Sequence, residues 1–126
     1  MRYYIFDTSF LIALLKLDDS NHHKAIDIIE QFDLAIVQFF INPLIYWETL
    51  TVCKVRTIDY CIPIFDRFLS EIKAKVINCN FEEYHSACKS SITKMSVCDW
   101  SVVCDAKKYD AIPLTFDEEL MREYLK

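Results

Sequence analysis

The chain has 126 residues, of which 53% are hydrophobic and 14% aromatic, and a net charge of −5. The composition excludes a disordered chain and supplies enough apolar residues for one packed domain, which we predict to span residues 1–126. No apolar run approaches the ~18 residues of a membrane span, and an acidic residue interrupts the N-terminal apolar stretch, so we expect a cytoplasmic protein without a signal peptide or membrane partner. The negative charge argues against non-specific binding to a phosphate backbone.

The glycine and cysteine contents exclude two further classes of protein. There is no glycine, and therefore no glycine-rich loop of the P-loop or dinucleotide-binding kind. The six cysteines form no C-x-x-C pair, and the three histidines have no zinc-finger spacing relative to them. Several cysteines lie among apolar residues, so we interpret them as reduced core thiols, with a redox or adventitious metal role as the alternative. The cysteines are Cys53, Cys61, Cys79, Cys88, Cys98 and Cys104.

Short apolar segments alternate with segments of helical periodicity along the chain. The predicted elements are a strand at 3–6, a helix at 10–17, a helix at 21–32, a strand at 34–37, a helix at 43–55, a break near 57–58, a helix at 60–72, a strand at 75–79, helices at 81–90 and 97–109, a strand at 111–115 and a closing helix from 117. This alternation predicts an α/β fold with a short central parallel sheet covered by helices on both faces.

Three aspartates occupy positions from which they can reach one edge of this sheet. Asp7 follows the first strand, Asp117 follows the last, and Asp99 lies near the start of a helix. The carboxyl ends of parallel strands form a ligand-binding crevice, so these acids are candidates for an active site. Each also has a structural interpretation, because aspartate is a common helix N-cap and favours the first helical turn. At the first helix Ser9 would serve equally well as the cap.

Glu48 is a fourth candidate acid. Its neighbours on the predicted helix are almost all apolar, which indicates a half-buried carboxylate unless that side of the helix faces water. Burying an ionised carboxylate is costly without a partner or a cation. Several carboxylates at one crevice repel one another unless protons or cations lie between them. A set of oxygen ligands without histidine or cysteine indicates Mg²⁺ or Mn²⁺ rather than zinc.

The segments IFDTSFLIALL, WETL, VCDWSVVCDA and PLTFDEEL together resemble the PIN-domain family, most closely its VapC-type toxin ribonucleases, over nearly the whole chain. The resemblance implies a three-layer α/β/α PIN-like domain and an endoribonuclease that hydrolyses RNA phosphodiester bonds with Mg²⁺ or Mn²⁺. It also implies a homodimer and an antitoxin partner in a type II toxin-antitoxin pair. The catalytic and metal-binding residues that it assigns are Asp7, Glu48, Asp99 and Asp117, with Ser9 and Thr115 as supporting hydroxyls.

In this interpretation Asp7 and Asp99 bind the metal directly, Asp117 binds it directly or through water, and Glu48 orients the attacking water. Family members usually continue into a further short strand after the fourth acid, whereas this sequence stops at Lys126, which bears on the completeness of the sheet and not on the acids. Asp105 lies six residues after Asp99, off its helical face, and we interpret it as a solvated or secondary acid.

Two surfaces are candidates for binding partners. Cations near the predicted crevice are either RNA phosphate contacts or ordinary solvated charges; they are Lys54, Arg56, Lys107 and Lys108. Apolar residues around the helix at 42–55 offer a surface for an amphipathic antitoxin helix, a homodimer seam or plain core; they are Tyr46, Trp47, Leu50 and Ile58.

Other functions fit the sequence less well. A haloacid-dehalogenase-type phosphotransferase needs a second aspartate two residues after the first, where Ser9 stands, and a receiver domain needs a late lysine where Thr115 stands. A stand-alone RNA-processing nuclease remains an alternative to a toxin. A non-catalytic PIN-like module that binds RNA or protein also remains, although retention of all four acids disfavours it.

Overall fold

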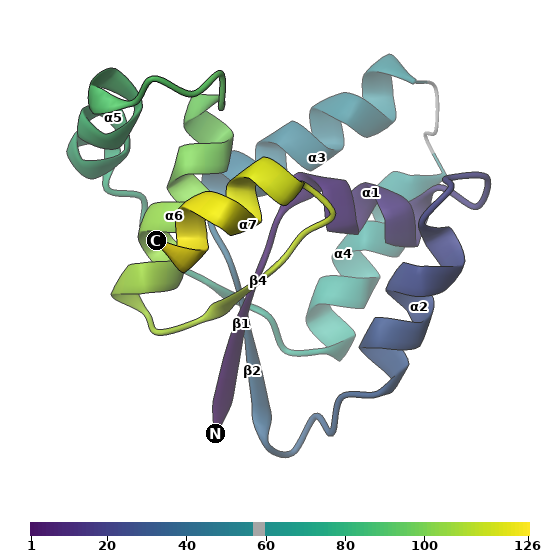
Figure 1. Ribbon diagram of the computed structural model, residues 1–126. Coiled ribbons are helices and arrows are strands. Elements are labelled where there is room, and N and C mark those ends of the chain that lie inside the picture. Colours follow the sequence, from purple (N-terminus) through teal and green to yellow (C-terminus); the bar gives the residue numbers. More distant parts are fainter. Residues whose placement is uncertain (57–59) are drawn as a thin grey trace.

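The computed structural model describes residues 1–56 and 60–126, so the break predicted near residues 57–58 lies outside the described residues. These ranges form seven α-helices and a four-stranded parallel sheet with strand order β3-β2-β1-β4 (Figure 1). The elements are β1 (Arg2–Phe6), α1 (Thr8–Leu15), α2 (His22–Glu30), β2 (Val37–Ile41), α3 (Pro43–Val55), α4 (Cys61–Glu71), β3 (Lys75–Val76), α5 (Phe81–Ser90), α6 (Val97–Lys108), β4 (Ile112–Leu114) and α7 (Glu118–Leu125). The predicted α/β fold is confirmed.

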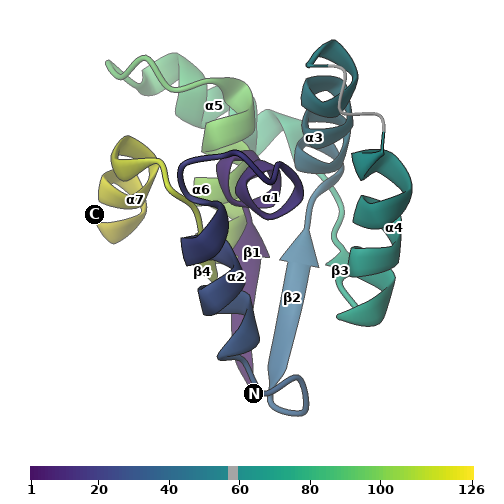
Figure 2. The same ribbon diagram turned by 90° about the vertical axis from the view of Figure 1, so that its right-hand side faces the viewer.

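The sheet is the middle of three layers. Figure 1 shows α1, α2 and α4 on one side of the strands and α5, α6 and α7 on the other, with α3 at the carboxyl end of the sheet. In the turned view the central strands lie side by side with α1 and α2 in front of them (Figure 2). In the part of the chain that the structure covers, no helix is long and apolar enough to cross a membrane.

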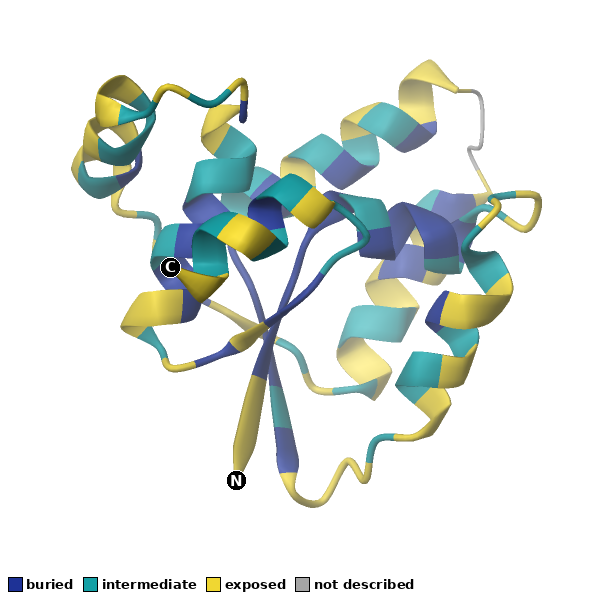
Figure 3. Ribbon diagram, in the orientation of Figure 1, coloured by how far each residue is buried: buried dark blue, intermediate teal, exposed yellow. Residues whose placement is uncertain are grey.

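Aromatic side chains of the two central strands form much of the core. Phe6 of β1 and Phe39 of β2 are fully buried and stack with ring centroids 5.3 Å apart. Burying one such side chain stabilises the fold by about 1.5–3 kcal/mol. Buried residues continue along the carboxyl halves of β1 and β2, whereas the N-terminal end of β1 is exposed (Figure 3). The carboxyl ends of β1 and β2 therefore lie in the core, where packing holds side chains in fixed positions.

The second strand was predicted at 34–37, and this was wrong by three residues. Leu34 and Ile36 are 53% and 55% exposed and belong to a turn. Asp33 holds the turn, because its carboxylate accepts a hydrogen bond from the Ala35 N–H at 3.0 Å and its carbonyl accepts one from the Ile36 N–H at 3.1 Å. A local side-chain hydrogen bond of this kind competes with strand formation. The strand begins only at Val37, where burial begins.

The third strand was predicted at 75–79, but only Lys75 and Val76 pair with β2. Both residues are exposed at the edge of the sheet. Two turns place non-glycine residues in the left-handed region, Lys73 after α4 and Asp110 after α6, with φ of 54° and 52°. A chain without glycine has to use other residues in such turns, and aspartate tolerates this region better than most.

Candidate active site

Asp7 lies at the carboxyl end of β1, and its two carboxylate oxygens have different surroundings. Its Oδ2 accepts hydrogen bonds from the hydroxyls of Ser9 and Thr115, each at 2.7 Å. The side chain is 2% exposed, yet Oδ1 is buried without a hydrogen-bond partner among the described residues. The pairing of β1 with β4 places Thr115 here, because the Asp7 N–H donates to the carbonyl of Leu114 at 3.1 Å.

Burial raises the pKa of Asp7 above its ordinary value, and the hydrogen bonds from Ser9 and Thr115 partly oppose this effect. The hydroxyls are themselves held in place. Ser9 Oγ accepts from the Phe116 N–H at 3.0 Å, and Thr115 Oγ1 accepts from the Asp117 N–H at 3.0 Å. Both supporting hydroxyls predicted from the sequence therefore contact Asp7.

Each of the three candidate aspartates is also part of a helix cap. Asp7 Oδ2 accepts from the Ser9 N–H at the start of α1, and Asp117 Oδ1 accepts from the Leu120 N–H at the start of α7. Asp99 forms a capping box with Ser96 at the start of α6. Every cap uses one carboxylate oxygen, and the structure shows no hydrogen bond to the other oxygen within residues 1–56 and 60–126. The role of each aspartate as a helix cap is therefore compatible with a role as a cation ligand, because the two roles use different carboxylate oxygens.

Electrostatic coupling shows that the three aspartates lie near one another. The pKa of Asp99 is raised to about 6 by burial, by the charge of Asp7 and by the charge of Asp117. Like charges at one site disfavour ionisation unless a cation compensates them. The arrangement from β1, α6 and the β4–α7 connection thus groups Asp99 with the two aspartates whose charges act on it, and we refer to these three residues as the acidic cluster.

Glu48 is the candidate acid of α3. It is partly buried, as the sequence predicted, and lies next to Cys98. Burial and a hydrogen bond to Glu48 raise the pKa of the Cys98 thiol to about 12, with smaller contributions from the charges of Asp99 and Asp7. Cys98 is therefore close enough to Glu48, Asp99 and Asp7 for all three charges to affect its thiol. The sequence did not single out Cys98 as part of the site.

The carboxylates of the four candidate acids are suitable ligands for a hard divalent cation, but their side chains do not have the geometry of a metal site. Among the described residues, no group of three or more His, Cys, Asp or Glu side chains has metal-binding geometry. The caps explain this, because Asp99 and Asp117 are turned toward their own helix N-termini. The unpartnered Asp7 Oδ1 is the atom that a cation would satisfy, and carboxylate oxygens are ligands that Mg²⁺ and Mn²⁺ prefer.

The sequence indicated that Asp105 is a solvated or secondary acid, and the solvated interpretation is wrong. It is 1% exposed, and its Oδ2 accepts hydrogen bonds from Asn42 Nδ2 at 3.0 Å and from the Tyr84 hydroxyl at 2.5 Å. Burial raises its pKa. The helical spacing of Ser101, Val102 and Asp105 could have placed it on the inner face of α6, since residues three and four apart share a face.

The candidate cations are not equally placed. Lys107 and Lys108 lie in the last turn of α6, whereas Asp99 lies in its first turn. Eight or nine residues of helix separate them by about 12–13 Å along the axis. These two lysines therefore lie away from the acidic cluster, while Lys54 and Arg56 lie at the end of α3.

The predicted apolar partner surface divides between core and exterior. Tyr46 packs onto α4, with its ring 5.4 Å from that of Phe65 and its hydroxyl donating to Asp66 at 2.8 Å. Leu50 is partly buried against the core, and Trp47 is 64% exposed. Ile58 lies outside the described residues.

The chain belongs to the PIN domain family, since the PIN domain model matches residues 4–124. Its fold is similar to that of VapC20 from Mycobacterium tuberculosis, a sarcin-ricin loop cleaving toxin, with a TM-score of 0.79 and 15% identity over 94% of this chain and 93% of the other. VapBC2 from Rickettsia felis, solved bound to a DNA fragment from its promoter, has a TM-score of 0.67 and 13% identity over 95% and 92%. No curated protein sequence matches the chain significantly. The predicted PIN-like fold is thereby confirmed.

Proposed function

We propose that this protein is a cytoplasmic endoribonuclease that hydrolyses RNA phosphodiester bonds with Mg²⁺ or Mn²⁺. The observation that carries the proposal is the Asp7 carboxylate, which is buried beside Asp99 and Asp117 with one oxygen unpartnered in the described structure. Membership of the PIN domain family supports it.

Each side chain has a distinct part in this reaction. Asp7, Asp99 and Asp117 would hold the cation through the carboxylate oxygens that their caps leave over. Ser9 and Thr115 fix the rotamer of Asp7 by donating to its other oxygen. Glu48, which is partly exposed, would orient the attacking water. A divalent cation here supplies Lewis-acid chemistry, because it offsets negative charge on the phosphate and favours deprotonation of water.

Replacing Asp7 or Asp99 by asparagine tests this function. We expect Asp7→Asn and Asp99→Asn to lower cleavage of a single-stranded RNA by about 100-fold or more, because each loses a charged ligand while keeping its shape. Asp27→Asn is the matched control, since Asp27 is an exposed aspartate on α2. Cleavage is measured in Mg²⁺ and in Mn²⁺, with melting temperatures to confirm folding. Control-level rates in either variant would contradict the assignment.

We further propose that the nuclease is the toxin of a type II toxin-antitoxin pair and forms a homodimer. Trp47, Val55 and Ile64 on α3 and α4 are 64%, 75% and 46% exposed, which provides apolar area for an amphipathic partner helix. A partner arginine or lysine reaching the acidic cluster would occupy the place of the cation. The alternative is a stand-alone RNA-processing nuclease.

Light scattering with size exclusion distinguishes these possibilities. For the toxin we expect a dimer alone, and a larger assembly that no longer cleaves RNA when the chain is co-expressed with the product of the neighbouring reading frame. Trp47→Ser should weaken that assembly, because it removes the most exposed aromatic ring of α3. A strict monomer that no neighbouring gene product affects would argue against both the dimer and the antitoxin.

A further inference from the structure

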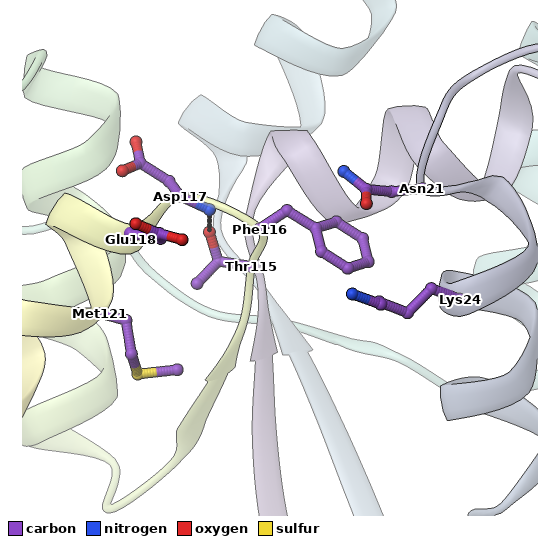
Figure 4. Close-up of a pocket in the computed structure, with 7 residues that line it drawn as sticks. All are labelled: Asn21, Lys24, Thr115, Phe116, Asp117, Glu118 and Met121. Carbon is purple, nitrogen blue, oxygen red and sulfur yellow. Dashed lines mark hydrogen bonds between the residues drawn. The ribbon is translucent and has the colours of Figure 1, made fainter.

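A cavity of about 420 Å³ opens beside the acidic cluster (Figure 4). Asp117 and Glu118 form one wall, and Asn21 and Lys24 of the α2 region form the wall across from it. Phe116 lies between the two walls. One wall thus carries negative charge that belongs to the candidate active site, and the other carries hydrogen-bond donors and a positive charge.

A second cavity of about 290 Å³ adjoins the first, because Asn21 and Phe116 line both. Thr115 lines the first cavity and Ser9 lines the second, and these are the two hydroxyls that donate to Asp7. The two cavities therefore form one groove, the Asn21–Phe116 groove, that passes directly over the partners of the buried carboxylate.

Phe116 provides a rigid aromatic surface within this groove. Its ring stacks on Phe10 with a centroid distance of 5.5 Å and an interplanar angle of 14°, and Phe10 is 1% exposed. The Phe116 N–H donates to Ser9 Oγ at 3.0 Å, which holds its backbone. Phe10 covers one face of the ring while the rest of the side chain borders both cavities, so little side-chain entropy is lost when a base stacks there.

Lys24 supplies a cation to the first cavity, and Arg56 lines the second. The Lys24 side chain is exposed and extends from α2 toward the centre of the first cavity (Figure 4). It forms no salt bridge within the described ranges. A lysine in this position offers three donors to a phosphate without first breaking an ion pair.

We propose that the Asn21–Phe116 groove binds a single strand of RNA, with Lys24 holding a backbone phosphate next to the one that is cleaved and Phe116 stacking an unpaired base. A single strand is required because Asp7 is 2% exposed, so the reacting phosphate has to enter the groove, and because a base is free to stack only when it is unpaired. This inference rests on the proposed nuclease function and adds its substrate-binding site.

Binding and cleavage of a short single-stranded RNA test the groove. Lys24→Ala should raise KM about tenfold with kcat within twofold, and Phe116→Leu, which keeps apolar contact with Phe10, should also raise KM about tenfold. In an Asp7→Asn background, where RNA stays intact, Lys24→Ala should reduce the magnitude of the slope of log affinity against log salt by about 0.7, as expected for one lost phosphate contact. Lys24→Arg should recover most of the affinity.

Lys89→Ala is the matched control, since Lys89 is an exposed lysine of α5 on the other side of the sheet. It should leave KM and the salt slope unchanged. If the wild type cleaves RNA but Lys24→Ala and Lys89→Ala behave alike, the groove assignment is wrong and the nuclease stands. If the wild type neither cleaves nor binds RNA, both proposals fail. Equal cleavage of a duplex and a single strand would also overturn the single-strand assignment.

Discussion

Asp7 uses its two carboxylate oxygens for different purposes. Oδ2 caps α1 and receives two hydroxyl hydrogen bonds, while Oδ1 is buried without a partner in the described structure. A buried polar atom without a hydrogen bond is costly and marks a place where a ligand is expected. Asp99 and Asp117 also cap helices, each with one carboxylate oxygen, at the starts of α6 and α7. Capping orients these carboxylates, and in the proposed site the remaining oxygens would bind a cation.

The pKa of Asp99, raised to about 6, predicts an unusual pH dependence of stability without metal. The folded protein holds this proton more tightly than the unfolded chain, so stability should fall as pH rises from about 4 through about 6. We expect thermal unfolding in a chelator to show a higher melting temperature near pH 5 than near pH 7. Burial raises the pKa of Asp7 and Asp105 in the same direction.

Asp99→Asn should make this difference in melting temperature smaller, because the substituted residue no longer titrates. Asp27→Asn should leave it unchanged, since Asp27 is exposed on α2 and the charges that raise the pKa of Asp99 are those of Asp7 and Asp117. If the melting temperature changes equally with pH in Asp99→Asn and wild type, titration of Asp99 is not the cause of the pH dependence.

At the scale of elements, Asn42 joins the helix that carries Glu48 to the helix that carries Asp99. Its Oδ1 caps α3 by accepting from the Ile45 N–H at 2.9 Å. Its Nδ2 lies 3.0 Å from both Ser101 Oγ and Asp105 Oδ2 of α6. The cap was predictable from Asn-Pro at the start of a helical pattern, but the second contact was not, because it joins residues 63 positions apart.

Asn42→Ala should lower the free energy of unfolding by about 2–4 kcal/mol. The cap accounts for about 1 kcal/mol, and leaving the buried Asp105 with fewer donors accounts for the rest. Asn42→Ser restores only the cap and should recover about 1 kcal/mol. Urea denaturation measures both, with Asn80→Ala as the control because Asn80 caps α5 at an exposed site. Equal losses for Asn42→Ala and Asn80→Ala would show that the contact with α6 contributes nothing.

At the scale of the molecule, the acids converge because strand order brings β1 next to β4 and places α3 and α6 around them. The sequence predicted this arrangement from buried strands that end in acidic residues, since parallel strands share a carboxyl edge. The predicted start of β2 was wrong because a local turn at Asp33 occupies the apolar residues before it. The predicted length of β3 was wrong because this strand is an exposed edge strand of two residues. The burial of Asp105 and the cavities beside Phe116 depend on tertiary packing, which periodicity does not report.

In the proposed function, Asp7, Asp99, Asp117 and Glu48 form one divalent-cation site. The most direct measurement is the melting temperature of wild type and Asp7→Asn as Mg²⁺ or Mn²⁺ is titrated, with Asp27→Asn as the control. A ligand bound only by the folded state stabilises it by about 2.7 kcal/mol at a hundredfold excess over its dissociation constant. We predict that both metals raise the melting temperature of wild type and control, and that Asp7→Asn responds far less. Equal shifts in all three proteins would place the metal elsewhere and contradict the account.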